Sequence, residues 1–275
     1  QFYKKREFDY ANAVDGLRQI LWGLFKKMVI ADNCGELANI IFNNYSDFSG
    51  VTLVFGAIFF SFQIYGDFSG YSDIAIGTSR LFGFNLKRNF AFPYFSRDVA
   101  EFWRRWHISL STWFRDYIYI PLGGSEGGMG RKLRNTFVIF LVSGFWHGAN
   151  LTYIFWGLIH ALFYIPSFII KWKNIRISQH DYKIFRILGI VQTFITVTLA
   201  WIYFRSASIY DANKYITRLF TPSNYNRELF SWRSSITDGS HVEFLFILIL
   251  FFIFWRVYQS KYFIVKNAFL TVSIL

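Results

Sequence analysis

The chain has 275 residues, of which 53% are hydrophobic, 23% aromatic and only 17% charged, and its net charge is +12. Because soluble domains carry about 25% charged residues, this composition argues against a soluble globular protein and indicates a chain partly surrounded by lipid. The positive charge does not predict nucleic-acid binding, since the Lys and Arg residues cluster between apolar runs and no nucleic-acid-binding motif accompanies them. The single cysteine, Cys34, excludes an intrachain disulfide and a cysteine-based zinc site.

The first apolar run, residues 51–65, is short for a membrane-spanning helix, which needs roughly 20 mostly apolar residues. It continues directly into the polar stretch QIYGDFSGYSD at 63–73. Carboxylates at membrane depth are costly, so Asp67 and Asp73 either belong to a hydrogen-bonded junction between helices or line a functional site. Their spacing does not place them on one helical face, which argues against a catalytic acid pair. The glycines of this region predict close helix approach, and they are Gly66, Gly70 and Gly77.

The next stretch, residues 101–124, reads EFWRRWHISLSTWFRDYIYIPLGG. Aromatic and apolar residues recur here at helical spacing, Asp98 and Glu101 suit a first turn, and Pro121 suits an end. We therefore predict one continuous helix between Asp98 and Pro121, with rings over much of its surface and arginines that reach a polar interface or channel. From these residues alone, His107 is best interpreted as a buried structural histidine.

The glycine-rich stretch at 123–130 lacks the Gly-Lys-Ser/Thr ending of a phosphate-binding loop and predicts a flexible turn. The apolar run after it, 136–146, is again short and ends at His147, within SGFWHGA. A histidine at membrane depth is costly unless it is paired or used. The small residues beside His147 predict room for a ligand to come close to the backbone.

Two longer runs, 150–172 and 187–204, predict membrane-spanning helices, and 244–255 predicts a further one. The polar stretch 206–240, between the runs 187–204 and 244–255, predicts an extramembrane loop with a short helix. Among the remaining histidines, His160 is interpreted as a core residue, whereas His180 and His241 lie in polar stretches and are expected at the surface. Basic clusters lie between successive apolar runs. If every run, including the short ones, crossed the membrane, these clusters could not all lie on the cytoplasmic side. We therefore predict an all-α, multi-pass membrane protein in which some short runs form interfacial or re-entrant helices.

Four motifs resemble the membrane-bound O-acyltransferase (MBOAT) family. They are QIYGDFSGYSDIAIG at 63–77, NFAFPYFSRDVAEFWRRWHISLSTWFRDYIYIPLGG at 89–124, RNTFVIFLVSGFWHGAN at 134–150 and WGLIHAL at 156–162, and GLFKKMVIADN at 23–33 is similar as well. The resemblance covers residues 8–166 and is strongest to the bacterial AlgI/DltB-like branch, which includes alginate O-acetylation proteins, peptidoglycan O-acetyltransferases and D-alanyl transfer proteins. It implies a polytopic transmembrane helical bundle around a central tunnel, with residues 1–275 as a single domain whose usual N-terminal helices are missing.

The resemblance also implies an enzyme that transfers an acyl group from a thioester donor to a hydroxyl. The near-invariant histidine of the family corresponds to His147, the general base, and its second, upstream polar position corresponds to His107. The developing oxyanion then needs a donor, which is either His107 or the backbone N–H groups near Gly148. If both histidines serve one reaction, we expect their side chains within roughly 10 Å of each other. The predicted substrate-binding residues around them are Asp67, Tyr71, Arg104, Arg105 and Trp146.

We expect no metal and no bound cofactor, and the co-substrate implied by the resemblance is a thioester, either acetyl-CoA or an acyl carrier protein. The implied acceptor is an extracytoplasmic glycan: alginate, another exopolysaccharide, peptidoglycan or a teichoic acid. Acetyl is favoured over D-alanyl as the acyl group. The resemblance predicts a bacterial cytoplasmic (inner) membrane location, with the lipid bilayer and either an SGNH-type acetyltransferase or an acyl carrier protein as partners.

Two other classes of protein stay open. A transporter for the polysaccharide or the acyl donor would use the region from Asp67 to Asp73 as its path. It would remain functional without the imidazole of His147. A non-catalytic membrane scaffold would tolerate the loss of both His107 and His147. The family motifs favour the enzyme, whereas periodicity alone does not decide between these classes.

The two long apolar runs, 150–172 and 187–204, should make the full-length protein integral to the membrane, because transferring them to water would expose large apolar surfaces. Washing membranes with alkaline carbonate should therefore leave the protein in the pellet, and detergent should release it. Release by carbonate alone would contradict the prediction.

Overall fold

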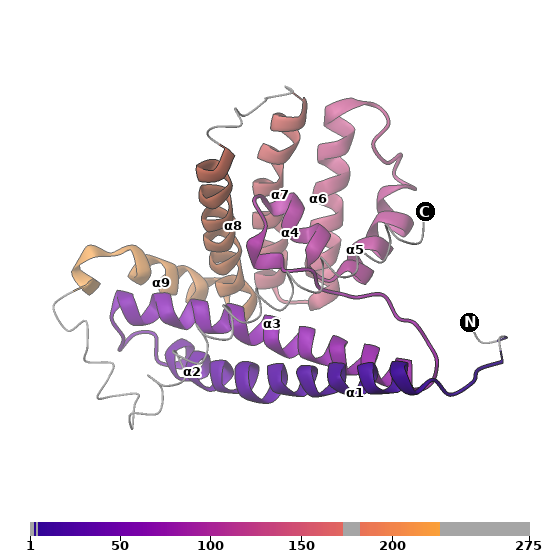
Figure 1. Cartoon of the computed structure of the whole chain (residues 1–275). Helices are drawn as coiled ribbons and strands as arrows, with labels where there is room; N and C mark the ends of the chain where they lie inside the picture. The colour runs from indigo at the N-terminus through magenta and orange to yellow at the C-terminus, as the bar shows by residue number, and fades with distance from the viewer. Residues whose placement is uncertain (1–2, 4, 173–181, 226–275) are drawn as a thin grey trace. The chain divides into compact units, whose positions relative to one another are not determined.

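A computed structural model of the chain describes residue 3 and residues 5–172 and 182–225 (Figure 1). Within these residues the regular elements are all helices, which confirms the all-α prediction. Helices α1 to α9 belong to one unit, residues 1–224, and residues 225–275 form a second unit of which only Tyr225 is described. The predicted span at 244–255 and the predicted surface residues His180 and His241 lie outside the described residues.

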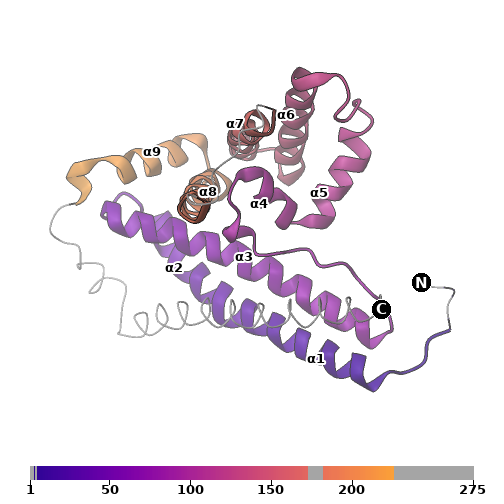
Figure 2. The same cartoon turned by 45° about the horizontal axis from the view of Figure 1, so that its top comes forward.

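The N-terminal part of the chain is an uninterrupted helical run that packs against one long helix. Helix α1 (Tyr10–Phe25) continues through the π-helix η1 (Lys26–Ala31) into α2 (Asp32–Asn43), and all three contact α3 (Gly50–Leu81). Figures 1 and 2 show α1 and α3 side by side. A Cβ added to Gly23 of α1 would lie 2.6 Å from the backbone oxygen of Gly70 on α3, and one on Gly16 would lie 2.8 Å from that of Gly77. The predicted close approach at these glycines of α3 is therefore confirmed.

Helix α3 extends well beyond the short apolar run that predicted it. It continues through the polar stretch 63–73 to Leu81, and this stretch forms the predicted hydrogen-bonded junction, here between α3 and η1. The physical reason is that η1 supplies charge partners. The Lys27 Nζ lies 2.8 Å from Asp67 Oδ1, and the buried Lys26 forms an ion pair with Asp73. Because its carboxylates are paired with lysines, the polar stretch can stay helical where it packs against α1 and η1.

The second group of helices is formed by α6 (Gly128–His147), α7 (Leu151–Trp172) and α8 (Tyr182–Arg205), which stand side by side (Figure 1). The contact between α6 and α7 is again made at glycines. A Cβ on Gly144 would lie 2.5 Å from the backbone oxygen of Tyr153, and one on Gly157 would collide with that of Phe140. On their outer surfaces α7 and α8 expose large apolar side chains, as expected for helices in contact with lipid: Leu162, Phe163, Ile184, Leu188 and Ile195.

Three described helices are long and apolar enough to cross a membrane: α3, residues 151–169 of α7 and residues 184–205 of α8. The last two correspond to the predicted spans at 150–172 and 187–204. The short run at 136–146 lies within α6, which is not among the three. The first run becomes long enough only because α3 continues through its polar part.

The predicted short helix after the last described span is α9 (Ile209–Phe220), which begins at the N-cap Ser208. It is amphipathic, with Ala212, Tyr215 and Leu219 buried. The Tyr215 hydroxyl donates a hydrogen bond of 2.6 Å to the backbone oxygen of Leu53, which attaches α9 to the start of α3. The remainder of the predicted loop, 226–240, lies outside the described residues.

The predicted continuous helix between Asp98 and Pro121 is wrong. The segment consists of α4 (Val99–Arg105), α5 (Ile108–Phe114) and the π-helix η3 (Arg115–Tyr119), and the chain leaves the helical conformation at Trp106 and His107. Residues 89–91 lie beside this break and take part in its backbone hydrogen bonds: Ala91 N–H donates to Arg105 O, and Ile108 N–H donates to Asn89 O. The glycine-rich stretch after η3 is the predicted turn, with positive φ at Gly123, Gly124, Gly127 and Gly128.

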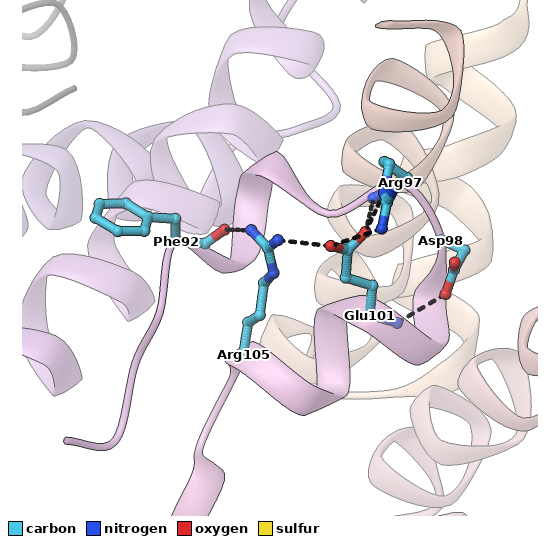
Figure 3. Close-up of polar contacts among 5 residues, drawn as sticks. All are labelled: Phe92, Arg97, Asp98, Glu101 and Arg105. Carbon is cyan, nitrogen blue, oxygen red and sulfur yellow. Dashed lines mark hydrogen bonds and ion pairs between the residues drawn. The ribbon is translucent and has the colours of Figure 1, made fainter. Parts of the chain in front are cut away.

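Helix α4 is held by a buried carboxylate between two arginines (Figure 3). Glu101 accepts hydrogen bonds from Arg97 Nε at 2.8 Å and from Arg105 Nη2 at 2.5 Å, while its own N–H is capped by Asp98 at 2.7 Å. Arg105 Nη1 also reaches the backbone oxygen of Phe92 at 3.5 Å. This network ties both ends of the short helix α4 to the segment that precedes it.

Replacing Gly23 by Ala should destabilise the protein, although alanine favours helices, because the added Cβ would meet both the Gly70 carbonyl and Ile74. Overpacking of this kind typically costs about 1–3 kcal/mol. The matched control is Gly130→Ala, since Gly130 is also helical and has open space around its Cβ position. Thermal unfolding in detergent, followed by tryptophan fluorescence, should show a lower midpoint for the first variant only; equal midpoints would contradict the close contact.

Replacing Glu101 by Gln should lower the free energy of unfolding at neutral pH by about 1–3 kcal/mol, the usual contribution of hydrogen bonds to charged groups. Burial raises the pKa of Glu101, but hydrogen bonds from Arg97 and the charge of Arg105 outweigh it and leave that pKa below its ordinary value of 4.5. The stabilisation is therefore complete above pH 4.5 and is lost as the pH falls through the lower, folded-state pKa.

The unfolding midpoints of wild type and Glu101→Gln should accordingly differ by a constant amount from pH 7 to about 5 and converge in more acidic buffer. The control is Asp116→Asn, because its pair with Arg115 is exposed and such pairs contribute little. A difference between wild type and Glu101→Gln that persists undiminished in acid would show that Glu101 acts without its charge.

Candidate active site

His107 lies at the break between α4 and α5 in a strained backbone conformation. Its φ and ψ are 44° and 55°, in the left-handed region that non-glycine residues rarely occupy. The conformation is imposed by the segment at 89–91, whose backbone bonds to both sides of the break. Such strained residues persist only where surrounding contacts over-determine them, and they concentrate at functional sites.

The side chain of Asn89 reaches the same place. Its Oδ1 accepts hydrogen bonds of 3.0 Å from both the N–H and the hydroxyl of Ser109, and it lies 3.3 Å from Nδ1 of His107. On another side, the ring of Phe68 from α3 meets the imidazole edge-on, with ring centroids 4.6 Å apart. His107 is therefore held between α3 and the segment that precedes α4.

His147 is the last residue of α6 and lies among aromatic rings. Its imidazole centroid is 5.2 Å from Trp156 of α7, 5.1 Å from Phe204 of α8 and 5.0 Å from the neighbouring Trp146. Neither ring nitrogen has a hydrogen-bond partner among the described residues. The imidazole is thus fixed by ring packing alone, and both nitrogens are available to a substrate.

The small residues beside His147 have a different role from the predicted one. The space at Gly144 is taken by the backbone of α7, and a Cβ on Gly148 would lie 2.7 Å from the ring of Tyr153. The expectation that these glycines leave room for a ligand is therefore wrong. They allow α7 to come close to α6, which is what brings Trp156 against His147.

A continuous series of ring contacts connects the two histidines. From His107 it passes through Phe68, Phe90, Trp106, Trp201 and Trp156 to His147, with successive centroids 4.6 to 5.6 Å apart. Burial lowers the pKa of His107 to about 4, with a smaller contribution from the charge that His147 can carry.

Burial likewise lowers the pKa of His147 to about 4. Both imidazoles are therefore neutral at pH 7, and each keeps a nitrogen lone pair. A neutral histidine can take a proton from a hydroxyl as that hydroxyl attacks a carbonyl. The low pKa maintains this form, although it also makes each ring a weaker base. Among the described residues, no carboxylate bonds to either ring, and no three His, Cys, Asp or Glu side chains form a group that could hold a metal ion.

His160 on α7 is fully buried, as predicted for a core residue. Its Nδ1 accepts a hydrogen bond of 3.3 Å from Trp103 Nε1, and its ring stacks on Phe102. Its Nε2 has no partner among the described residues. The histidine is therefore packed but only half satisfied.

The structure gathers only some of the predicted substrate-binding residues around the histidines. Trp146 contacts His147 and is more than half exposed. Asp67 is adjacent in sequence to Phe68, but its carboxylate pairs with Lys27, and Tyr71 one turn further along α3 is exposed. Arg105 is engaged with Glu101, as Figure 3 shows. Arg104 is exposed and has no hydrogen bond or ion pair to a described residue.

Three residues of the site are missing from the prediction: Asn89, Phe68 and Trp156. Asn89 lies in a non-helical segment far along the chain from His107, and no periodicity relates the two. Trp156 falls in a uniformly apolar run where no residue stands out. Only the fold brings these side chains to the histidines.

Comparisons with known proteins identify the family of this chain. The model of the membrane-bound O-acyltransferase family matches residues 2–210. A protein named "Probable alginate O-acetylase AlgI" from Pseudomonas syringae pv. tomato is 40% identical over 207 residues, which are 75% of this chain and 39% of that protein. The peptidoglycan O-acetyltransferase of Helicobacter pylori is 39% identical over 206 residues, covering 75% of this chain and 38% of the relative. A teichoic acid D-alanyltransferase from Streptococcus thermophilus is 36% identical over 172 residues, covering 56% and 40%.

The matched segment spans about two fifths of the length of these curated relatives. It includes both histidines and all three candidate membrane spans. The match and the spans together identify a multi-pass membrane protein, and the chain belongs to the membrane-bound O-acyltransferase family.

Proposed function

We propose that the protein to which this chain belongs transfers an acyl group from a thioester donor to hydroxyls of an extracytoplasmic polysaccharide, with His147 as the general base. The observation that carries the proposal is the state of His147. It is neutral, packed between rings of α7 and α8, and without a hydrogen-bond partner on either nitrogen among the described residues. Both nitrogens are therefore free to bond to a substrate hydroxyl, as a general base requires.

The reaction needs one proton to move twice. As the hydroxyl oxygen attacks the thioester carbonyl carbon, a C–O bond forms and His147 takes the hydroxyl proton. The tetrahedral intermediate carries its negative charge on the former carbonyl oxygen. When the intermediate collapses, the C–S bond breaks, and the imidazolium returns the proton to the leaving sulfur. The neutral starting state of His147 suits the first step.

The relatives support a glycan acceptor and an acetyl group. Those at 38–40% identity are named for O-acetylation of alginate or peptidoglycan, whereas those named for D-alanylation of teichoic acid are 32–36% identical. We propose acetyl-CoA or an acyl carrier protein as the donor and the bacterial cytoplasmic membrane as the location. An SGNH-type acetyltransferase acting on the same glycan is a proposed partner.

The described residues offer less support for a transporter. Its path would need carboxylates that are free to bind a moving substrate, but Asp67 and Asp73 are paired with Lys27 and Lys26. In these positions they hold α3 to η1. A scaffold, in turn, would have no use for two neutral histidines connected by a continuous series of ring contacts.

His147→Gln should abolish most acyl transfer without lowering the amount of protein in the membrane. Glutamine has a similar size and can form hydrogen bonds, but it cannot take a proton near neutral pH. The expected loss is about 10²-fold or more, the usual size of general-base catalysis. The measurement is the acyl content of the glycan in a deletion strain complemented with each full-length variant, normalised to protein level.

His160→Ala is the matched control, because His160 is a buried histidine of the neighbouring helix that bonds only to Trp103. Its effect should be one of packing, so that acyl content follows protein abundance. Near-normal acylation by His147→Gln would exclude His147 as the base and would favour the transporter or the scaffold.

A further inference from the structure

We propose that Asn89 is a positioning residue that holds His107 as the Nδ1–H tautomer, so that His107 presents Nε2 as a hydrogen-bond acceptor toward the hydroxyl substrate. The inference rests on the proposed function for the identity of that substrate. The tautomer itself rests only on contacts around the break between α4 and α5.

The orientation of the Asn89 amide is determined by the backbone. The Ser109 N–H can only donate, and it lies 3.0 Å from the atom assigned as Asn89 Oδ1. If the amide were turned over, its NH₂ group would face this N–H and two donors would oppose each other. The atom facing His107 at 3.3 Å is therefore the amide oxygen, which cannot donate.

The second neighbour of the same ring nitrogen leads to the same conclusion. The Ser109 hydroxyl donates its hydrogen to Asn89 Oδ1 at 3.0 Å and lies 3.4 Å from His107 Nδ1. With its hydrogen directed at Asn89, this hydroxyl presents lone pairs to the imidazole. Both polar neighbours of Nδ1 are thus acceptors, so Nδ1 carries the hydrogen. A neutral imidazole has only one N–H, which leaves a lone pair on Nε2.

This assignment decides between two roles for His107. A neutral ring with its hydrogen on Nδ1 cannot donate from Nε2 to an oxyanion, so that role falls to another donor such as a backbone N–H. His107 can instead accept the hydrogen of a neighbouring hydroxyl on the same sugar and so orient the substrate, while the hydrogen of the attacking hydroxyl goes to His147. Among the described residues, the titratable group whose charge acts on His107 is His147, so no carboxylate enforces this tautomer in place of Asn89.

The backbone strain at the break is consistent with this role. The left-handed conformation of His107 brings its side chain back toward Asn89, and the Asn89 carbonyl accepts the N–H of the next residue, Ile108, at 3.0 Å. Asn89 therefore contacts His107 and the two residues after the break with its side chain and its backbone. A helix continuing through residue 107 would use the N–H groups of Ile108 and Ser109 for its own hydrogen bonds.

The first test reads the tautomer and does not depend on activity. Full-length protein labelled with ¹⁵N-histidine, in lipid bilayers at pH 7.5, is studied by solid-state NMR, and the His107 signals are assigned by their loss in His107→Gln. Wild type should show a protonated Nδ1 and an unprotonated Nε2. Asn89→Leu should show both tautomers or the reverse one. A protonated Nε2 in wild type, or an unchanged spectrum in Asn89→Leu, would overturn the inference.

The second test is a double-mutant cycle that separates positioning from folding. The rate of CoA thiol release is measured with purified full-length protein in nanodiscs, using acetyl-CoA and alginate oligosaccharides as probes. Asn89→Leu should lower kcat by about 10- to 100-fold, the range seen when the hydrogen-bond partner that orients a functional histidine is removed. In a His107→Ala background the same change should have no further effect, because Asn89 acts through His107. Equal losses in both backgrounds would overturn the role.

Asn89→Asp provides rescue by a conservative variant. The carboxylate also accepts Nδ1–H and the Ser109 N–H, so it should restore most of the activity that leucine removes when the pH is above 8. Its negative charge raises the pKa of His107, so the fall of kcat in acid should begin at a higher pH than in wild type. A residue that only braced the turn would give rescue with no change in the pH profile, which would overturn the inference.

Asn44→Leu serves as the control for the loss of an asparagine, since the side chain of Asn44 is exposed and only caps a carbonyl at the end of α2.

The outcomes also distinguish this inference from the proposed function. If wild type releases no CoA thiol, the choice of donor or acceptor fails, and the NMR result still decides the tautomer. If His147→Gln keeps full activity, the assigned base fails, and the cycle still decides whether Asn89 acts through His107.

Discussion

Polar groups at membrane depth must find partners inside the protein, and this constraint accounts for most of the architecture. Water is absent there, so an unpaired carboxylate or ammonium is far more costly than at a soluble surface. The chain meets the constraint by pairing the acidic residues of α3 with two consecutive lysines of η1. The glycines that face each other across α1 and α3 bring the helices close enough for these short side-chain contacts. Charge pairing and small residues therefore act together.

The break between α4 and α5 is subject to the same need for partners. Interrupting a helix releases backbone groups, and where these are shielded from water they must bond to another part of the chain. Residues 89–91 supply that part, and Glu101 with its two arginines anchors the preceding turn. The result is a histidine in a left-handed conformation that is held by the hydrogen bonds of residues 89–91 and by the ring of Phe68. Strain at this residue is offset by the hydrogen bonds around it.

The two histidines differ in how they are held, and the difference suits different roles. His107 has a polar partner on Nδ1, whereas His147 is surrounded by rings and its nitrogens have no partner among the described residues. Burial keeps both neutral at physiological pH. A group that accepts and returns a proton needs freedom at its nitrogens, while a group that orients a substrate needs a defined tautomer. The proposed transfer to a hydroxyl would require both, because the nucleophile is weak and must be held in a defined geometry.

The amino-acid sequence by itself determined the fold class, the two long apolar spans and the family, because these depend on local composition and on contiguous motifs. It also predicted His107 and His147 as candidate site residues, since both lie within such motifs. It did not predict the break at His107, because helical periodicity continues through this residue and the bonds that interrupt it come from 89–91. The length of α3 and the packing role of Gly144 and Gly148 were likewise decided by partners on η1 and α7. Hydrogen bonds and helix contacts between distant segments have no signature in local pattern, so only the tertiary structure could show that Asn89 belongs with His107.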